Sequence, residues 1–346
     1  MKKGKRFLAL VLSGLLVLSL AACSGRETTT TSTAATGTTT ATNGSIKKTV
    51  KNPYKDKIKL AYVAHDIGTP PNQAWLKGMQ LATAYYGNIT VQGFDGKSSA
   101  ENQVKIMQEI INQKYDAIIL QASDGAALAA SVTAAEKAGI PVIGLNLDAN
   151  APHAALVQAA DYDAGRLVAE NMAKQFNGKG NFVIIQGVQG LGRTDNLEKG
   201  FRDTLAKHPD MKIVGAQPAD FQKEKAMSVM NSFLQSNAKI DGVFAVNDAM
   251  AEGASLAAQS AGRLNGMAIW GADGEKDALN MIEKGQLTGT IYTNYYDEGS
   301  TAAKLALYCI GSPFDTSTIT KTPVVNMEPV VATKDTVASI QPSDRW

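Results

Sequence analysis

The sequence has few of the residues that metal and redox chemistry require. Among its 346 residues, two are cysteine and three are histidine. His65, His153 and His208 are scattered without the spacing of metal ligands, so we expect no metal site. Cys23 ends an apolar N-terminal run, which leaves Cys309 as the one thiol of the remaining chain. A lone thiol cannot close an internal disulfide, so the fold must depend on its core.

Signals for nucleic-acid binding and for catalysis are also missing. The 34 basic and 32 acidic residues nearly balance, and no basic run is interleaved with aromatic residues. The glycine-rich segment 187–192 follows a predicted strand, but its spacing is neither that of a dinucleotide fingerprint nor that of a P-loop. No Gly-x-Ser-x-Gly elbow occurs. We therefore expect no nucleic-acid partner, no cofactor and no enzyme activity.

The N-terminus is typical of an exported lipoprotein. Four of the first six residues are basic, and residues 7–20 form an apolar run shorter than a membrane span. The run ends in Leu20-Ala21-Ala22-Cys23, which resembles a bacterial lipobox. This predicts a signal peptide over residues 1–22 and a diacylglycerol on Cys23 that anchors the mature protein to the outside of the cell membrane. The alternative is an ordinary signal peptide with an incidental cysteine.

The segment that follows the predicted anchor is rich in threonine and poor in large apolar residues. Residues 23–46 cannot bury enough surface to fold, and we expect them to form a disordered tether. The folded part then starts near Lys47. About 300 residues remain, which is enough for two lobes of ordinary domain size.

From Lys57 onward, short β-branched runs alternate with helical stretches, a pattern typical of parallel α/β sheets. The first half has predicted strands at 58–63, 89–94, 117–121, 141–145 and 155–159, with helices at 73–86, 100–113, 126–138 and 164–177. The second half has strands at 182–186, 212–216, 242–246, 268–271 and 288–292, with helices at 196–207, 224–235, 249–261 and 277–283. The order repeats, which predicts two Rossmann-like lobes.

Polar side chains follow several predicted strands. Ligands of open parallel sheets bind beyond the carboxyl ends of the strands, and carboxylates and amides suit hydroxyl ligands. The candidate ligand contacts are Asp66, Asn72, Trp75, Asn146, Arg193, Asp195, Asn196, Phe221, Asn247, Asp273 and Asn294. Further polar or aromatic groups near the same places are His65, Asp161, Tyr292, Tyr295 and Tyr296.

Three of these candidates have a structural alternative. Asp195 starts a capping-box pattern, so it caps a helix, contacts a ligand, or does both. Asn72 lies in the first turn of a predicted helix after Pro70 and Pro71, and has either a turn role or a ligand role. Trp75 lies on a helical face and either packs in the core or stacks on a sugar ring.

The chain from Lys57 to about Val330 resembles the ribose and galactose branch of the periplasmic binding proteins of type I. The resemblance rests on Tyr115-Asp116-Ala117-Ile118-Ile119, Ala138-Gly139-Ile140-Pro141-Val142-Ile143, Gln217-Pro218-Ala219-Asp220-Phe221, residues 243–254 and Gly271-x-Asp273-Gly274. It implies two lobes joined by three crossovers, near 160–161, 293–294 and 325–326. The first lobe would be 47–160 plus 294–325, and the second 161–293 plus 326–346.

The resemblance also implies a sugar site, but its departures point away from ribose. Asn247, Asp273 and Phe221 match positions that contact the sugar in the family. Pro71-Asn72 replaces two aromatics, Asn146-Leu147 replaces an Asp-Arg pair, and Asp195 takes the place of an arginine. The ligand implied is another monosaccharide, a sugar alcohol or an amino sugar.

The function implied is that of a monomeric solute receptor that closes on its ligand and delivers it to an ABC transporter permease. Three alternatives stay open at this point. The chain is a ligand-sensing receptor for a signalling system, or it binds a nucleoside or another small polar metabolite, or it is a sugar-modifying enzyme. The export signal and the lack of an N-terminal helix-turn-helix argue against a transcription repressor of the same fold.

Overall fold

A computed structural model of the chain describes residues 50–346. The predicted signal peptide, Cys23 and the predicted tether lie outside these residues. From Ile46 onward the chain forms one compact unit with its own hydrophobic cores, so we expect residues 46–346 to fold without the preceding segment. In the described part, no helix is long and apolar enough to cross a membrane.

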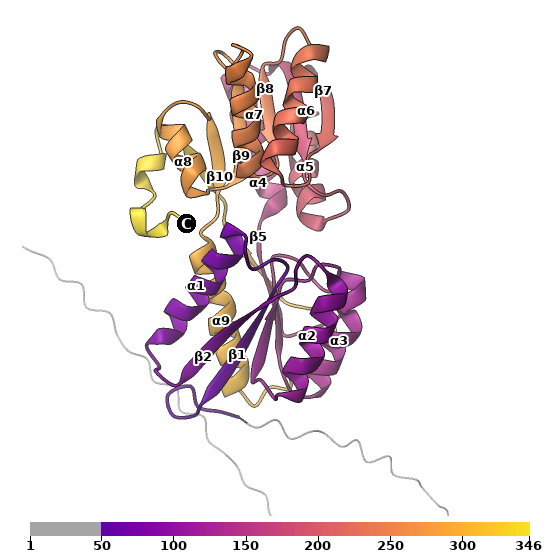
Figure 1. The fold of residues 1–346 in the computed structure, drawn as a ribbon, viewed down its shortest axis with the longest axis vertical. Helices are drawn as coiled ribbons and strands as arrows, with labels where there is room; N and C mark the ends of the chain where they lie inside the picture. Colours follow the sequence, from indigo (N-terminus) through magenta and orange to yellow (C-terminus); the bar gives the residue numbers. More distant parts are fainter. Residues whose placement is uncertain (1–49) are drawn as a thin grey trace, which may run out of the picture. The chain divides into compact units, whose positions relative to one another are not determined.

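The first lobe is a six-stranded parallel sheet between two layers of helices (Figure 1). Its strands are β1 (Ile58–Ala64), β2 (Ile89–Asp95), β3 (Ala117–Leu120), β4 (Val142–Leu145), β5 (Ala155–Ala159) and β11 (Val324–Met327), in the order β11-β5-β4-β3-β1-β2. Helices α1 (Pro70–Ala84) and α9 (Tyr295–Gly311) cover one face, and α2 (Ala100–Asn112) and α3 (Gly125–Lys137) cover the other. Strands such as β3 are wholly apolar because both faces are covered.

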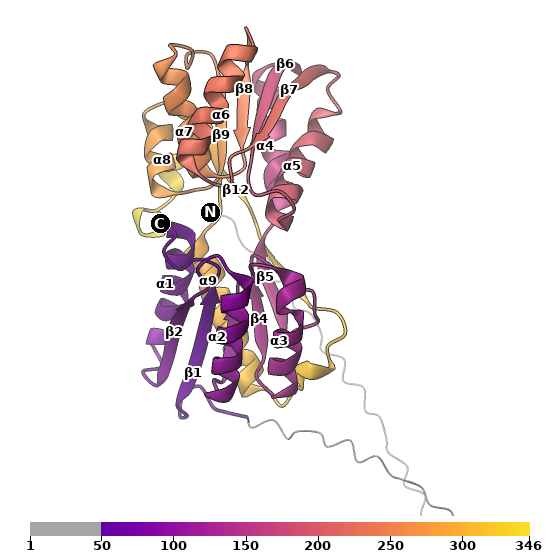
Figure 2. The same ribbon diagram turned by 45° about the vertical axis from the view of Figure 1, so that its right-hand side comes forward.

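The second lobe repeats this arrangement (Figure 2). Its strands are β6 (Lys179–Gln186), β7 (Asp210–Pro218), β8 (Gly242–Ala245), β9 (Ala268–Asp273), β10 (Gly289–Tyr292) and β12 (Val330–Thr333), in the order β12-β10-β9-β8-β6-β7. All neighbours are parallel except β12, which runs antiparallel to β10. Its helices are α4 (Asp161–Gln175), α5 (Gly192–Leu205), α6 (Lys223–Ser236), α7 (Asp248–Ser260) and α8 (Lys276–Glu283).

The predicted two-lobe α/β fold is confirmed, and the differences lie at the edges. Helix α5 begins at Gly192, four residues before the expected start at Asn196. The edge strands β11 and β12 were not predicted, because each pairs with one neighbouring strand only and is partly exposed, so that it lacks the buried apolar run of the inner strands. Strand β11 pairs with β5 as far as Met327, so the first sheet continues past the crossover expected at 325–326.

Glycines let the covering helices touch backbone to backbone in both lobes. A Cβ on Gly78 of α1 would lie 2.0 Å from the Tyr296 carbonyl oxygen, and one on Gly299 of α9 would lie 2.2 Å from that of Trp75. In the second lobe, Gly165 of α4 faces the Leu197 carbonyl in the same way. Since the obstructing atoms are backbone, the helix pairs can pack this closely only with glycine at these positions.

We expect Gly78→Ala to destabilise the protein by about 1–3 kcal/mol or more, because the added methyl group must push α1 away from α9. Gly192→Ala is the matched control, since a Cβ there meets no atom within 4 Å. Urea unfolding of residues 46–346 measures both. Equal stability of the two variants would contradict the close-packing argument.

Candidate ligand-binding site

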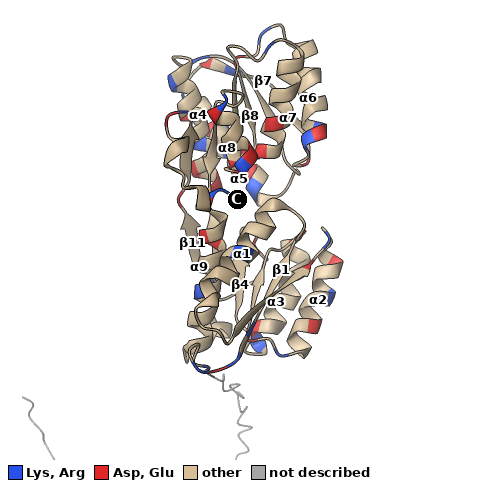
Figure 3. Cartoon of the chain, turned by 60° about the vertical axis from the view of Figure 1, so that its left-hand side comes forward, with Lys and Arg blue, Asp and Glu red and all other residues tan. Residues whose placement is uncertain are grey.

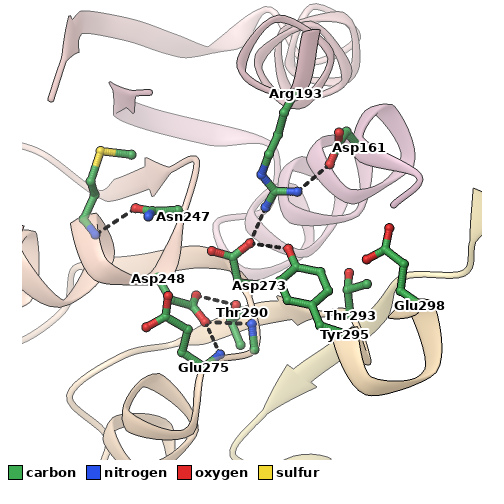
Figure 4. Close-up of polar contacts among 12 residues, drawn as sticks. Asp161, Arg193, Asn247, Asp248, Asp273, Glu275, Thr290, Thr293, Tyr295 and Glu298 are labelled. Atoms are coloured by element: carbon green, nitrogen blue, oxygen red, sulfur yellow. Dashed lines mark hydrogen bonds and ion pairs between the residues drawn. The ribbon is translucent and has the colours of Figure 1, made fainter. Parts of the chain in front are cut away.

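The carboxyl ends of β8 and β9 carry several polar side chains, which form separate hydrogen-bonded groups (Figure 4). Asn247 follows β8 and caps α7 by accepting a hydrogen bond from the Met250 N–H at 2.9 Å. The buried Asp248 accepts from the Gly274 N–H at 2.7 Å and the Glu275 N–H at 2.8 Å, and from the Thr290 hydroxyl at 2.6 Å. Asp248 therefore ties the start of α7 to the loop after β9.

Asp273, the last residue of β9, is the centre of a buried ion-pair network. Its Oδ1 accepts from the Arg193 guanidinium and, at 2.7 Å, from the Tyr295 hydroxyl. Arg193 also donates to Asp161 Oδ1 at 2.8 Å. Asp161 opens α4 directly after the first crossover, and Tyr295 opens α9 directly after the second. The Asp273 carboxylate is thus bonded directly to α5 and α9, and it is linked to α4 through Arg193.

Burial sets the charge states around this network. It raises the pKa of Asp161 to about 6, although the Arg193 charge opposes the shift. It raises the pKa of Asp273 as well, with Arg193 and Tyr295 opposing. Burial, followed by the charges of Asp273 and Asp248, raises the pKa of Glu275 to about 9. At neutral pH, Glu275 is therefore a neutral carboxyl group beside a carboxylate that an arginine compensates.

A second buried carboxyl group lies on α9. Glu298 accepts from the Trp75 indole N–H at 2.7 Å, and its other oxygen, Oε1, is buried without a hydrogen-bond partner. Burial raises the pKa of Glu298 to about 8; the Trp75 hydrogen bond opposes this and the Asp161 charge adds to it. The Trp346 ring stacks on Tyr295 at 4.5 Å, and its N–H donates to the Thr293 carbonyl at 3.1 Å. The second crossover is therefore enclosed by aromatic rings.

In the first lobe, Asp66 and Asn146 follow β1 and β4. Asn146 has a positive φ of 61°, and its side-chain oxygen is buried without a partner. Such an orphaned acceptor is costly unless a further donor reaches it. Asp66 accepts from the Gly68 N–H at 3.0 Å. His65, next to Asp66, contacts the Ser123 hydroxyl through Nδ1 at 2.7 Å.

Asn72 and Trp75 are held inside the first lobe. Helix α1 begins at Pro70, three residues before the expected bound at Gln73, so that Asn72 lies in its first turn as expected. The buried Asn72 side chain accepts from the Tyr62 hydroxyl and donates to Thr69 at 2.8 Å. Trp75 is 1% exposed and packs in the core against Tyr295. The indole ring has the core position that the sequence left open as one alternative.

Of the second-lobe candidates on α5, only Arg193 is part of the Asp273 network. The capping role expected for Asp195 is wrong, because α5 begins earlier, with Leu191 as its N-cap residue and no side-chain cap. Asp195 and Asn196 are exposed in the first turns of this helix.

Asn294 caps α9, accepting from the Asp297 N–H at 3.2 Å.

Phe221 lies beside the end of β6. It has a positive φ of 60°, and its ring reaches so close to Gly187 that a Cβ there would lie 2.3 Å from it. The same Cβ would lie 2.6 Å from the hydroxyl oxygen of Thr194, which is buried without a partner. The structure thus places an aromatic ring and an unbonded hydroxyl at one strand end.

Sequence reasoning did not select Asp248 or Glu298 for the site. Asp248 directly follows Asn247 after an apolar run, which was a usable signal. Glu298 lies on the buried face of α9 with Tyr295, Ala302 and Ala306, at helical spacing. In the sequence, Glu298 follows Tyr-Tyr-Asp and reads as one of two adjacent acidic residues in the first turn of a helix, so its burial is not evident. In the described residues, no group of three His, Cys, Asp or Glu side chains could hold a metal ion.

Comparison with known proteins gives consistent matches. A family model described as a periplasmic binding protein domain matches residues 51–311. The xylitol-binding protein of Mycolicibacterium smegmatis is 35% identical over 209 residues, which cover 60% of this chain and 60% of that protein. The D-allose-binding periplasmic protein of Escherichia coli is 29% identical over 254 residues, covering 69% of this chain and 81% of that protein.

Solved structures share the fold. A periplasmic solute-binding protein of an ABC transporter from Actinobacillus succinogenes, with bound D-allose, has a TM-score of 0.75 and 28% identity, covering 82% of this chain and all of that one. A solute-binding protein from Bacillus halodurans, with bound myo-inositol, has a TM-score of 0.75 and 24% identity, covering 82% and 97%. The type I arrangement of two lobes is therefore the fold of this chain.

The protonation of Glu298 predicts a pH dependence of stability. Its pKa in the folded state, about 8, lies above the ordinary 4.5, so the folded protein holds a proton that the unfolded chain releases. The resulting stabilisation is present below about pH 4.5 and is lost as the pH rises to about 8. Relative to Glu298→Gln, the wild type should lose on the order of a few kcal/mol across this window.

Thermal unfolding of residues 46–346 between pH 5 and 9 checks the difference. Glutamine keeps the size of the side chain and an acceptor for Trp75, so packing stays matched. Glu101→Gln, at an exposed position on α2, is the control and should leave the profile unchanged. Parallel profiles for the wild type and Glu298→Gln would show that Glu298 is ionised in the folded protein.

Proposed function

Because the chain belongs to the periplasmic binding protein family, we propose that it is the solute receptor of an ABC importer and binds a monosaccharide or a sugar alcohol between its two lobes. The observation that carries the proposal is the Asp273 network at the carboxyl end of β9. It holds an ionised carboxylate in fixed geometry at the sheet edge where ligands of open α/β folds bind.

The polar groups at the strand ends favour a ligand with several hydroxyl groups. Arg193 pairs with both Asp273 and Asp161, and Glu275 is neutral at pH 7 because burial raises its pKa. A polyhydroxylated ligand can donate to the Asp273 carboxylate and to the unpartnered Asn146 oxygen. The relatives named for xylitol and D-allose binding support this class.

We further propose that ligand binding closes the lobes. Residues after β1 and β4 belong to the first lobe, whereas Asn247 and Asp273 belong to the second, so one ligand that contacts both groups favours the state in which they are close. Asp161 and Tyr295 stand next to two crossovers and bond to the same network. Movement of these connections therefore changes the surroundings of Asp273.

The location and partners are part of the proposal. A lipid on Cys23 would keep the receptor on the outer face of the cell membrane, where a permease can take the ligand from it. We propose a monomer with no catalytic step, since the proposed function requires only that the lobes close on the ligand and open to release it. The lipobox resemblance of Leu20-Ala21-Ala22-Cys23 supports the anchor.

Calorimetric titration of residues 46–346 with pentoses, hexoses, amino sugars, sugar alcohols and nucleosides tests the proposal. We expect one saturable partner of micromolar or tighter affinity among the neutral sugars and sugar alcohols. Asp273→Asn should weaken its binding at least 100-fold, because a charge-assisted hydrogen bond to the ligand is lost and Arg193 loses an ion partner. Glu224→Gln, an exposed change on α6, should leave the affinity unchanged.

The titration has outcomes that overturn the proposal. Tight ribose binding would refute the argument from Asn72, Asn146 and Asp195. Binding of a nucleoside alone would keep the receptor and change its ligand class. Turnover of the bound ligand, measured by analysis of the recovered sugar, would replace a receptor with an enzyme.

A further inference from the structure

One end of the first lobe gathers exposed aromatic rings. Tyr54 is 68% exposed, Tyr85 is 85% exposed and Tyr308 is 72% exposed. Tyr85 follows α1 directly, and Tyr308 lies in the last turn of α9. The Tyr54 ring contacts that of Tyr86 at 5.0 Å. Three large rings in water on one end of a lobe are more than the scattered apolar residues that any surface carries.

Backbone contacts place these rings at the same end. The Lys51 N–H donates to the Ile310 carbonyl at the end of α9, and Pro53 lies 3.7 Å from the Cβ position of Gly311. On the other side, the Asn88 amide donates to the Pro53 carbonyl at 3.0 Å. The segment that carries Tyr54 therefore lies between the carboxyl ends of α1 and α9.

Lysines lie at the same end of the lobe. The segment 51–59 that leads into β1 has four lysines and one aspartate (Figure 3). The Lys59 ammonium donates to the Gln113 carbonyl at 2.9 Å, which brings the turn with the exposed Lys114 to the same end. Asp56 and Asp116 oppose these five lysines: Asp116 pairs with Lys51, and Asp56 accepts from the Asn52 N–H. The end therefore has an excess of positive charge.

We propose that this end of the first lobe, the basal surface, rests on an anionic lipid bilayer. The basal surface consists of Lys51, Tyr54, Lys55, Lys57, Tyr85, Lys114 and Tyr308. Tyrosine rings with a polar tip suit the boundary between headgroups and acyl chains, and lysines suit lipid phosphates. The described chain begins at Val50, on this surface.

The inference rests on the proposed extracytoplasmic anchoring, and it adds an orientation of the folded part on the membrane. A lipid on Cys23 would hold the protein near the membrane without fixing which end faces the bilayer. The basal surface would fix it, because the anchored segment enters the folded part there. The carboxyl ends of the strands, where the ligand contacts lie, are at the opposite end of the first sheet from the basal surface. Resting on the membrane would thus leave these strand ends clear of the bilayer.

Co-sedimentation of residues 46–346 with lipid vesicles tests the proposal. At low ionic strength, the protein should bind vesicles of equal parts phosphatidylglycerol and phosphatidylcholine, and bind vesicles of phosphatidylcholine alone far more weakly. Added salt at about 0.5 M should release it, because surface electrostatic attraction is screened. The triple variant Lys55→Gln, Lys57→Gln and Lys114→Gln should lower the partition coefficient on the order of 100-fold.

Two further variants test whether binding depends on the basal surface itself or only on the net charge of the protein. The triple variant Lys174→Gln, Lys207→Gln and Lys284→Gln changes exposed lysines of the second lobe by the same total charge, and it should bind vesicles nearly as the wild type does. The variant Tyr54→Ser, Tyr85→Ser and Tyr308→Ser should also lose binding, since the rings supply the apolar contact.

Failure of this proposal is distinct from failure of the proposed function. Calorimetric sugar binding should be the same in all three triple variants, because none of the substituted residues bonds to the Asp273 network. Absence of sugar binding in the wild type would refute the receptor whatever the vesicles show. Absence of binding to anionic vesicles, or equal losses in the two lysine variants, would overturn the basal surface while leaving the receptor intact.

Discussion

The site depends on one buried arginine between two carboxylates. Arg193 pairs with Asp161 and Asp273, and all three side chains are almost wholly removed from water. Buried carboxylates are stable only when a partner compensates them, so the loss of Arg193 would leave two charges unpaired. Arg193 also holds the Asp273 side chain in place at the end of β9. Tyr295 extends the same network to α9 and the second crossover. The proposed ligand contact at Asp273 and the lobe connections therefore share one set of contacts.

Much of the fold and part of the candidate site could be predicted from the sequence, because these features depend on residues that are neighbours in the chain. The succession of strands and helices along each half of the chain follows from apolar runs that alternate with helical stretches. Asn247 and Asp273 could be selected because a polar residue that directly follows a buried strand has few structural explanations. The role of Glu298 and the core position of Trp75 could not be predicted, because the burial of both depends on how α1 and α9 pack through Gly78 and Gly299. The start of α5 was misplaced because the pattern at Asp195 is a valid cap only when no earlier residue begins the helix.

The two halves of the chain use one architecture for different tasks. Glycine contacts join α1 to α9 and α4 to α5 in the same manner, and both sheets present polar residues at their carboxyl ends. The second lobe holds the charged network, whereas the first lobe presents Asn146 with an unsatisfied oxygen. A ligand with several hydroxyl groups can satisfy both, which is the physical basis of the proposed receptor.

Small-angle X-ray scattering of residues 46–346, with and without the sugar identified by titration, tests the central claim most directly. If the ligand joins the Asp273 network to the first-lobe strand ends, saturation should lower the radius of gyration, and Asp273→Asn at the same sugar concentration should not show the change. An unchanged radius of gyration at proven saturation of the wild type would contradict the account, because binding would then involve one lobe alone.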